Sequence, residues 1–136
     1  MGVLGKERKR EFAILVIWTL VLWGLLLAPI GEEGIASDLG FKHWDKIAHF
    51  CLFGVTGFVG AFAASFFGFG VLRSRILFGM ILGLFLAVCT EGAQSLISVR
   101  NGSPYDLLAD MAGLSVALPL YALLYRRRIG NSFFRF

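Results

Sequence analysis

Charged residues are scarce in this chain of 136 residues: Asp, Glu, Lys and Arg together make up 16%, against 57% hydrophobic residues. Soluble domains carry about 25% charged and about 45–50% apolar residues. A soluble fold of this length could not bury so much apolar surface. The composition therefore excludes a soluble protein and predicts an integral membrane protein of one domain.

Cysteines and the signatures of soluble enzymes are also lacking. The two cysteines, Cys51 and Cys89, lie in apolar stretches, where cysteine behaves as a small hydrophobic side chain. A disulfide between them would require two helices to align them. The sequence contains no P-loop, no G-x-S-x-G, no H-E-x-x-H and no Cys/His spacing typical of zinc sites. Any catalysis must therefore come from carboxylate, histidine and arginine side chains.

Four stretches of the sequence are long and apolar enough to cross a bilayer core about 30 Å thick, which needs about 20 residues of helix. They are Phe12–Ile30, Ile47–Leu72, Ile76–Ile97 and Leu107–Tyr125. The first stretch could instead be a secretory signal, but its apolar run exceeds 7–15 residues and no A-x-A cleavage site follows it. We therefore predict an all-α bundle of four transmembrane helices, residues 12–125, between a basic N-terminus, 1–11, and a basic-aromatic tail, 126–136.

Lys and Arg are distributed unevenly between the flanks of these stretches. Ten of the 13 lie in the N-terminus, the 73–75 loop and the C-terminal tail; the others are Lys42, Lys46 and Arg100. By the positive-inside rule we expect both termini in the cytoplasm and the loops 31–46 and 98–106 outside, in a multi-pass membrane protein. Because the basic residues gather at the chain ends and in one loop, the net charge of +4 does not indicate a nucleic-acid partner.

Eight polar residues then fall at one depth near the outer surface, although they are spread over 65 positions. Charges in a membrane helix cost roughly 2.5–3.5 kcal/mol each on insertion scales, so they persist mainly where they pair or function. Three pairs within the set are spaced i,i+3 or i,i+4 and so share a helix face. We expect one outward-facing cavity with Arg100 as its central cation, formed by Asp45, Lys46, His49, Glu91, Gln94, Arg100, Asp106 and Asp110.

These residues carry a resemblance to the VanZ-like family of small bacterial membrane proteins. The matching pieces are Asp45-Lys46-Ile47-Ala48-His49-Phe50, Glu91-x-x-Gln94, Arg100, and the D-x-x-x-D-x-x-G run from Asp106 through Asp110 to Gly113. The resemblance covers roughly residues 12–125. Many members carry Asn at the position of Asp110, which adds an anionic site here. The resemblance implies a multi-pass protein of the bacterial cell membrane with a role in the cell envelope, and the founding member is associated with low-level resistance to the glycopeptide teicoplanin.

Each candidate residue has a functional and a structural interpretation. We expect His49, Glu91 and Asp110 to act as acid, base or ligand contacts, because an imidazole beside carboxylates can transfer protons. Structurally, His49 could pair with Asp45 and Glu91 with Arg100 or Lys46. Asp106 could cap the fourth helix. The remaining ligand contacts would come from Asp45, Lys46, Gln94, Arg100 and Asp106.

The site permits three functions. We favour binding or modification of a lipid-linked or peptidoglycan-type envelope component, with an influence on glycopeptide susceptibility and membrane lipids as further partners. The alternative is an acid/base or metal-dependent hydrolase or transferase acting on a lipid phosphate, with Mg²⁺ or Mn²⁺ held by Glu91, Asp106 and Asp110. Proton-coupled transport is weaker, because no ionisable residue lies in the inner half of any span.

Gly79-x-x-x-Gly83 predicts close helix packing, either within the bundle or in a dimer.

Overall fold

The computed structural model describes residues 2–27, 44–96 and 104–133, and within these ranges it is helical without strands. Its helices are α1 (Gly2–Leu27), α3 (Trp44–Ala63), α4 (Leu72–Ser95) and α5 (Pro104–Phe133). All four are long and apolar enough to cross a membrane. The predicted all-α bundle of four membrane helices is confirmed, and the chain is a multi-pass membrane protein.

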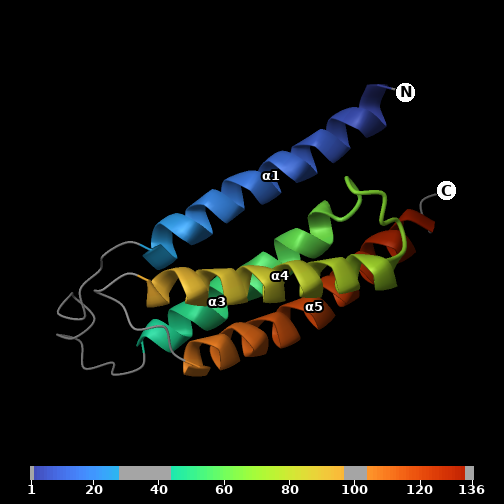
Figure 1. The fold of residues 1–136 in the computed structure, drawn as a ribbon. Coiled ribbons are helices and arrows are strands. Elements are labelled where there is room, and N and C mark those ends of the chain that lie inside the picture. The colour runs from blue at the N-terminus through green and yellow to red at the C-terminus, as the bar shows by residue number, and fades with distance from the viewer. Residues whose placement is uncertain (1, 28–43, 97–103, 134–136) are drawn as a thin grey trace.

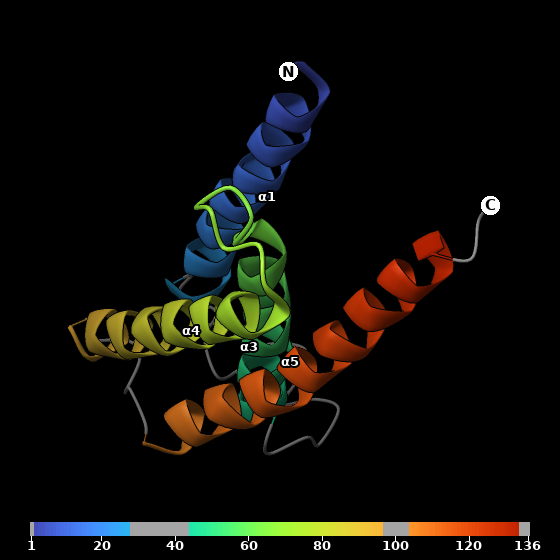
Figure 2. The same ribbon diagram turned by 90° about the vertical axis from the view of Figure 1, so that its right-hand side faces the viewer.

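Helix α3 is the centre of the bundle, since it packs against α1, α4 and α5 (Figures 1 and 2). The last turns of α1 and α4 and the first turns of α3 and α5 lie together at one end, on the left of Figure 1. This end carries Asp45, Glu91 and Asp106, and we call it the polar end. The first turn of α1, the last turn of α5 and the turn between α3 and α4 lie at the opposite end. Which end faces the cytoplasm stays a prediction.

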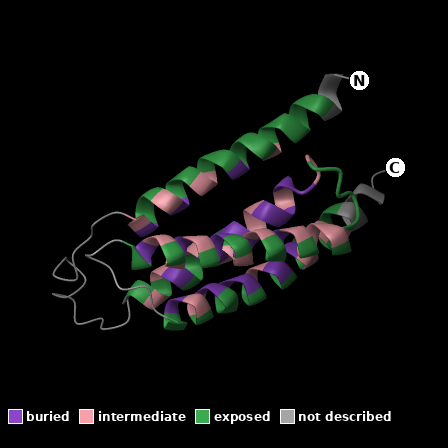
Figure 3. Cartoon of the chain, in the orientation of Figure 1, coloured by how far each residue is buried: buried purple, intermediate pink, exposed green. Residues whose placement is uncertain are grey.

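Large apolar side chains cover the outside of the bundle, as expected where hydrocarbon rather than water is the solvent. Leu20, Phe85 and Val88 are more than three-fifths exposed, and exposed residues follow the outward faces of the helices (Figure 3). The interior at mid-height is also apolar, formed by Leu22, Phe53, Leu86 and Leu114. With apolar groups on both sides, helix association depends on close packing and on polar contacts between helices.

Glycines set the closeness of that packing. A Cβ added at Gly79 on α4 would lie 2.7 Å from the Gly57 carbonyl oxygen on α3, and one at Gly113 on α5 would meet the Phe50 carbonyl oxygen. A Cβ at Gly83 would collide with Leu114. The glycines therefore bring α4 and α5 against α3, and the Gly79–Gly83 pair packs inside this bundle.

The second membrane helix ends earlier than the sequence predicts. It stops at Ala63 rather than Leu72, and residues 64–71 turn back toward α4. Gly68 has φ +89°, a conformation that favours glycine, and the turn packs through Phe66, whose ring stacks on that of Phe12 at 4.4 Å. Hydropathy could not reveal this helix end, because the turn is as apolar as the helix before it.

The outer helices are longer than their apolar runs. Helix α5 begins at Pro104, a residue suited to the first helical position, and continues past Tyr125 to Phe133. Helix α1 begins at Gly2, so the described part of the basic N-terminus is helical rather than a separate segment. Arg73 and Arg75, expected in a loop, lie in the first turn of α4. The length of an apolar run predicts how much of a helix lies within the membrane. The helix itself can continue beyond that run wherever its backbone hydrogen bonds still form.

Candidate functional site

The ionisable residues of the polar end come from three helices. Helix α3 contributes residues of its first two turns, α4 its last turn but one, and α5 its first two turns. The described members are Asp45, Lys46, His49, Glu91, Asp106 and Asp110. Helical spacing places them on inward faces, and the glycine contacts between α3 and α5 bring those faces together.

A buried histidine–carboxylate pair is the innermost element. His49 Nδ1 lies 2.9 Å from Asp110 Oδ1, and the two residues are 1% and 0% exposed. When the carboxylate of Asp110 is ionised it only accepts, so Nδ1 donates to it, and a neutral His49 ring then keeps a lone pair on Nε2. Neither His49 Nε2 nor Asp110 Oδ2 has a hydrogen-bond partner in the described part of the chain. Such atoms cost about 1–3 kcal/mol each when left unsatisfied.

Glu91 joins this pair from α4. Its Oε1 lies 3.9 Å from His49 Nδ1, and its side chain is 15% exposed. One donor atom from each of His49, Glu91 and Asp110 can be chosen so that all lie within 4.8 Å of one another. The structure thus brings together the three residues that the sequence predicts as catalytic, each from a different helix.

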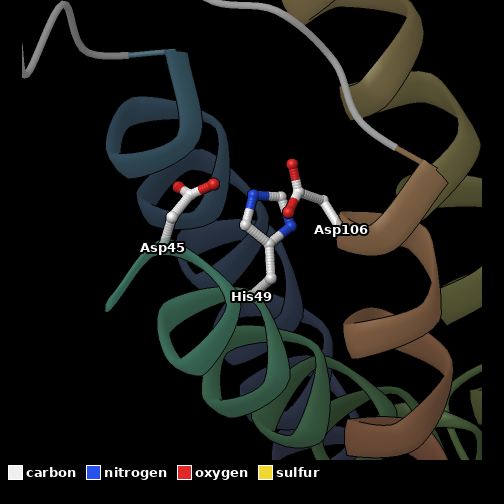
Figure 4. A group of neighbouring side chains, drawn as sticks. All are labelled: Asp45, His49 and Asp106. Atoms are coloured by element: carbon white, nitrogen blue, oxygen red, sulfur yellow. The ribbon is translucent and has the colours of Figure 1, made fainter. Parts of the chain in front are cut away.

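A second, more open group lies beside it, around Lys46. The Lys46 Nζ is 2.5 Å from Asp106 Oδ1 and 4.0 Å from Asp45 Oδ2. Asp106 is buried, whereas the side chain of Asp45 is half exposed. Figure 4 shows the His49 ring between the carboxyl groups of Asp45 and Asp106, so this histidine belongs to both groups. Asp106 lies in the first turn of α5, where a carboxylate also favours the helix dipole.

Negative charge dominates the described part of the site. Asp45, Glu91, Asp106 and Asp110 supply four carboxylates, and Lys46 is the one ammonium group among the described residues at this end. Burying charges in an apolar bundle is unfavourable unless they are paired and hydrogen-bonded. The arrangement therefore favours a ligand that brings positive charge or hydrogen-bond donors.

Gln94 and Arg100 do not join the described contacts. The Gln94 Nε2 donates to the backbone carbonyl of Leu26 at 2.9 Å and so holds α4 against the last turn of α1. Its predicted contact with a ligand stays a prediction. Arg100 lies outside the described residues, and so does its predicted pairing with Glu91.

The interhelical partners differ from those considered in the sequence. His49 pairs with Asp110 instead of Asp45, and Asp106 has a lysine partner besides its place in the first helical turn. Sequence reasoning also missed Phe53, a fully buried residue whose ring is nearly parallel to that of His49 at 6.4 Å. The sequence feature that could have indicated Phe53 is its i,i+4 spacing from His49, which puts both rings on the same face of α3. Cys51 and Cys89 are free thiols.

An apolar groove of about 380 Å³ lies between α3 and α5. Its lining begins at Phe50, the residue after His49, and at Gly113, one turn beyond Asp110, and continues to Phe58 and Leu120. A separate groove of about 450 Å³ along α4, between Phe69 and Phe85, contains no residue of the polar end. The first groove could hold a hydrocarbon chain whose head group reaches the ionisable residues.

The sequence matches no established family profile and no solved structure. An uncharacterized protein of the fission yeast Schizosaccharomyces pombe is 28% identical over 122 residues, which cover 90% of this chain and 68% of that protein. Because that protein is itself uncharacterized, the similarity carries no function to this chain.

Proposed function

We propose that this chain is a VanZ-like membrane protein that binds a lipid-linked component of the cell envelope, with the head group at the polar end. The observation that carries the proposal is the His49–Asp110 pair, which is almost fully buried yet keeps two polar atoms without partners among the described residues. Buried polar atoms are normally satisfied, so a site that leaves two of them open is suited to a ligand that completes it.

The chemistry of the surrounding groups indicates what kind of head group would fit. Carboxylates accept hydrogen bonds from hydroxyl and amide groups, which sugars and peptides supply. The Lys46 ammonium, already shared between two carboxylates, can contact a phosphate. The groove between α3 and α5 starts beside these groups and suits the hydrocarbon of the same molecule. A polyprenyl phosphate that carries a sugar or peptide has all three parts.

A binding measurement on the whole chain tests this function. The chain is reconstituted in nanodiscs that contain a polyprenyl diphosphate-linked sugar, and retained lipid is quantified by native mass spectrometry against an ordinary anionic phospholipid. Wild type should retain the linked sugar selectively, and Asp110→Asn should weaken retention by about tenfold or more, as expected for losing about 1.4 kcal/mol or more of binding energy. Equal retention of both lipids by wild type would overturn the proposal.

Two controls accompany this measurement. Glu7→Gln also removes one negative charge, but from an exposed pair with Arg10 near the N-terminus, so it should retain the lipid like wild type. Teicoplanin susceptibility of cells with and without the chain adds a cellular readout, motivated by the VanZ-like resemblance. A change in susceptibility that persists in Asp110→Asn would separate that phenotype from the site.

The second candidate function is an enzyme acting on such a lipid phosphate. It is favoured by the Nε2 lone pair of a neutral His49, which could accept the proton of an attacking water or hydroxyl while Glu91, in its protonated form, gives its proton to the leaving oxygen. Release of phosphate or of free head group by wild type, and its loss in His49→Gln, would establish it. Proton-coupled transport is less favoured, because the buried side chains of the described helices next to the site are mainly Leu and Phe, and the two buried threonines among them, Thr56 and Thr90, do not ionise.

A further inference from the structure

The excess of carboxylates at the polar end is unfavourable for binding the negative charge of a phosphate. Four carboxylates face one described ammonium group, and that ammonium is already 2.5 Å from Asp106. A phosphate placed among them would be repelled unless a further positive charge came with it. A bound metal ion is the compact way to supply that charge, and it also lets carboxylates stay ionised in a buried site.

We propose that His49, Glu91 and Asp110 bind one divalent transition-metal ion, with Zn²⁺ or Mn²⁺ as the best fit. Donor atoms on an ion at about 2.0–2.2 Å lie roughly 3–4 Å apart in tetrahedral or octahedral geometry. The His49 Nδ1 is 2.9 Å from Asp110 Oδ1 and 3.9 Å from Glu91 Oε1. Both separations from His49 Nδ1 therefore fall in the range that an ion requires, and one donor atom from each of the three residues can be chosen so that all lie within 4.8 Å of one another.

A second observation points to a ligand at this position rather than to a closed ion pair. Asp110 is fully buried, and its Oδ2 has no hydrogen-bond partner in the described part of the chain. A carboxylate that only paired with His49 would leave this oxygen desolvated at a cost. An ion beside Asp110 would satisfy it by coordinating one or both carboxylate oxygens.

The neighbouring group around Asp45 and Asp106 is a poorer site. Its donors also lie within 4.8 Å of one another when His49 is included, but Lys46 already lies beside both carboxylates and offsets one of their two charges. Asp45 is also exposed, so water would compete with its carboxylate as a ligand of the ion. In the buried group, His49 and Asp110 are almost fully shielded from water, so water competes less for their donor atoms.

The donor set narrows the choice of ion. Mg²⁺ and Ca²⁺ prefer oxygen ligands throughout, whereas an imidazole among carboxylates favours Zn²⁺, Mn²⁺ or Fe²⁺. Three protein ligands leave at least one coordination position for water or for a ligand oxygen. Binding through Nδ1 displaces the proton shared with Asp110, so about one proton should leave for each ion bound. The remaining ring proton then lies on Nε2, and the ion rather than His49 would activate a water.

This inference deepens the proposed function, since it names the ion through which a phosphate could be held, but it is tested without any lipid. The full chain is purified in detergent, treated with a chelator and incubated separately with Zn²⁺, Mn²⁺, Mg²⁺ and Ca²⁺. Bound metal is measured by elemental mass spectrometry after gel filtration, and proton release is followed in weak buffer. We expect one Zn²⁺ or Mn²⁺ per chain, with at least tenfold weaker binding of Mg²⁺ and Ca²⁺.

Variants locate the ion within the site. Asp110→Asn and Glu91→Gln should each weaken Zn²⁺ or Mn²⁺ binding at least tenfold. Asp45→Asn removes the same charge from the open group and should change binding less than threefold. Glu91 is only partly buried, so Glu91→Gln remains informative if Asp110→Asn misfolds, with folding checked by circular dichroism. Absence of stoichiometric metal in wild type, or an equal loss in Asp45→Asn, overturns the inference.

The metal and lipid measurements can refute the ion and the proposed function independently of each other. A wild-type chain that binds no metal but retains the linked sugar through Asp110 would refute the ion and leave the proposed function standing. A chain that binds one ion but retains no lipid selectively would refute the function and keep the ion.

Discussion

Gly113→Ala should damage the site without touching any ionisable group. A Cβ at this position would lie 3.0 Å from the Phe50 carbonyl carbon and 2.9 Å from the Gly54 nitrogen, and it would collide with the Phe50 carbonyl oxygen. All three are backbone atoms of α3, so no side chain can rotate away. Carbon atoms in contact lie about 3.5–4.0 Å apart. The helices must therefore separate locally by about 0.5 Å or more.

That displacement is large on the scale of the site. Phe50 follows His49 and Gly113 lies one turn after Asp110, so separation at this contact also moves the buried pair apart. The 2.9 Å hydrogen bond between His49 and Asp110 would lengthen to about 3.4 Å, which is beyond the usual range for N–H···O bonds. Forcing extra atoms into a well-packed interface also costs about 1–3 kcal/mol of stability.

Gly92→Ala is the matched control. It lies on α4 next to Glu91, and a Cβ there has nothing within 4 Å, so alanine should be neutral or stabilise the helix by up to about 1 kcal/mol. Unfolding of both variants is followed by circular dichroism as SDS is added to detergent micelles, together with Zn²⁺ binding. Only Gly113→Ala should unfold earlier and bind metal more weakly. Equal unfolding midpoints for Gly113→Ala and wild type would refute the packing argument.

Three other predictions follow from particular contacts. In a double-mutant cycle, His49→Gln and Asp110→Asn should couple by about 1–3 kcal/mol in the unfolding measurement because the residues are in direct contact, and additive effects would contradict the pair. Gln94→Leu removes the hydrogen bond from α4 to α1 and should cost about 0.6 kcal/mol, the average for hydrogen bonds between membrane helices, and at most about 1.7 kcal/mol by the same unfolding measurement. No loss of stability would contradict a stabilising role for this bond. Reporter fusions at position 35 and after Phe136 should show the first outside and the second in the cytoplasm, and the reverse pattern would place the polar end in the cytoplasm.

The sequence by itself determined the membrane class, the four membrane helices of the described residues and the end of the bundle at which their clustered ionisable residues lie. Apolar runs of about 20 residues specify helices that cross a bilayer, because an unsatisfied backbone in hydrocarbon is too costly. The i,i+4 spacing of Asp45 with His49, and of Asp106 with Asp110, specified which residues share a helix face. Both results depend only on the hydropathy and the residue spacing within a single helix.

Only the tertiary structure decided which residues on different helices meet. His49 could have turned toward Asp45 on its own helix, but close packing at Gly54 and Gly113 places Asp110 2.9 Å away. The end of α3 at Ala63 was likewise hidden, because the turn at Gly68 is embedded in an apolar run. Hydropathy and periodicity describe one helix at a time, whereas the rotation of helices and the distances between them depend on the interlocking of side chains from all of them.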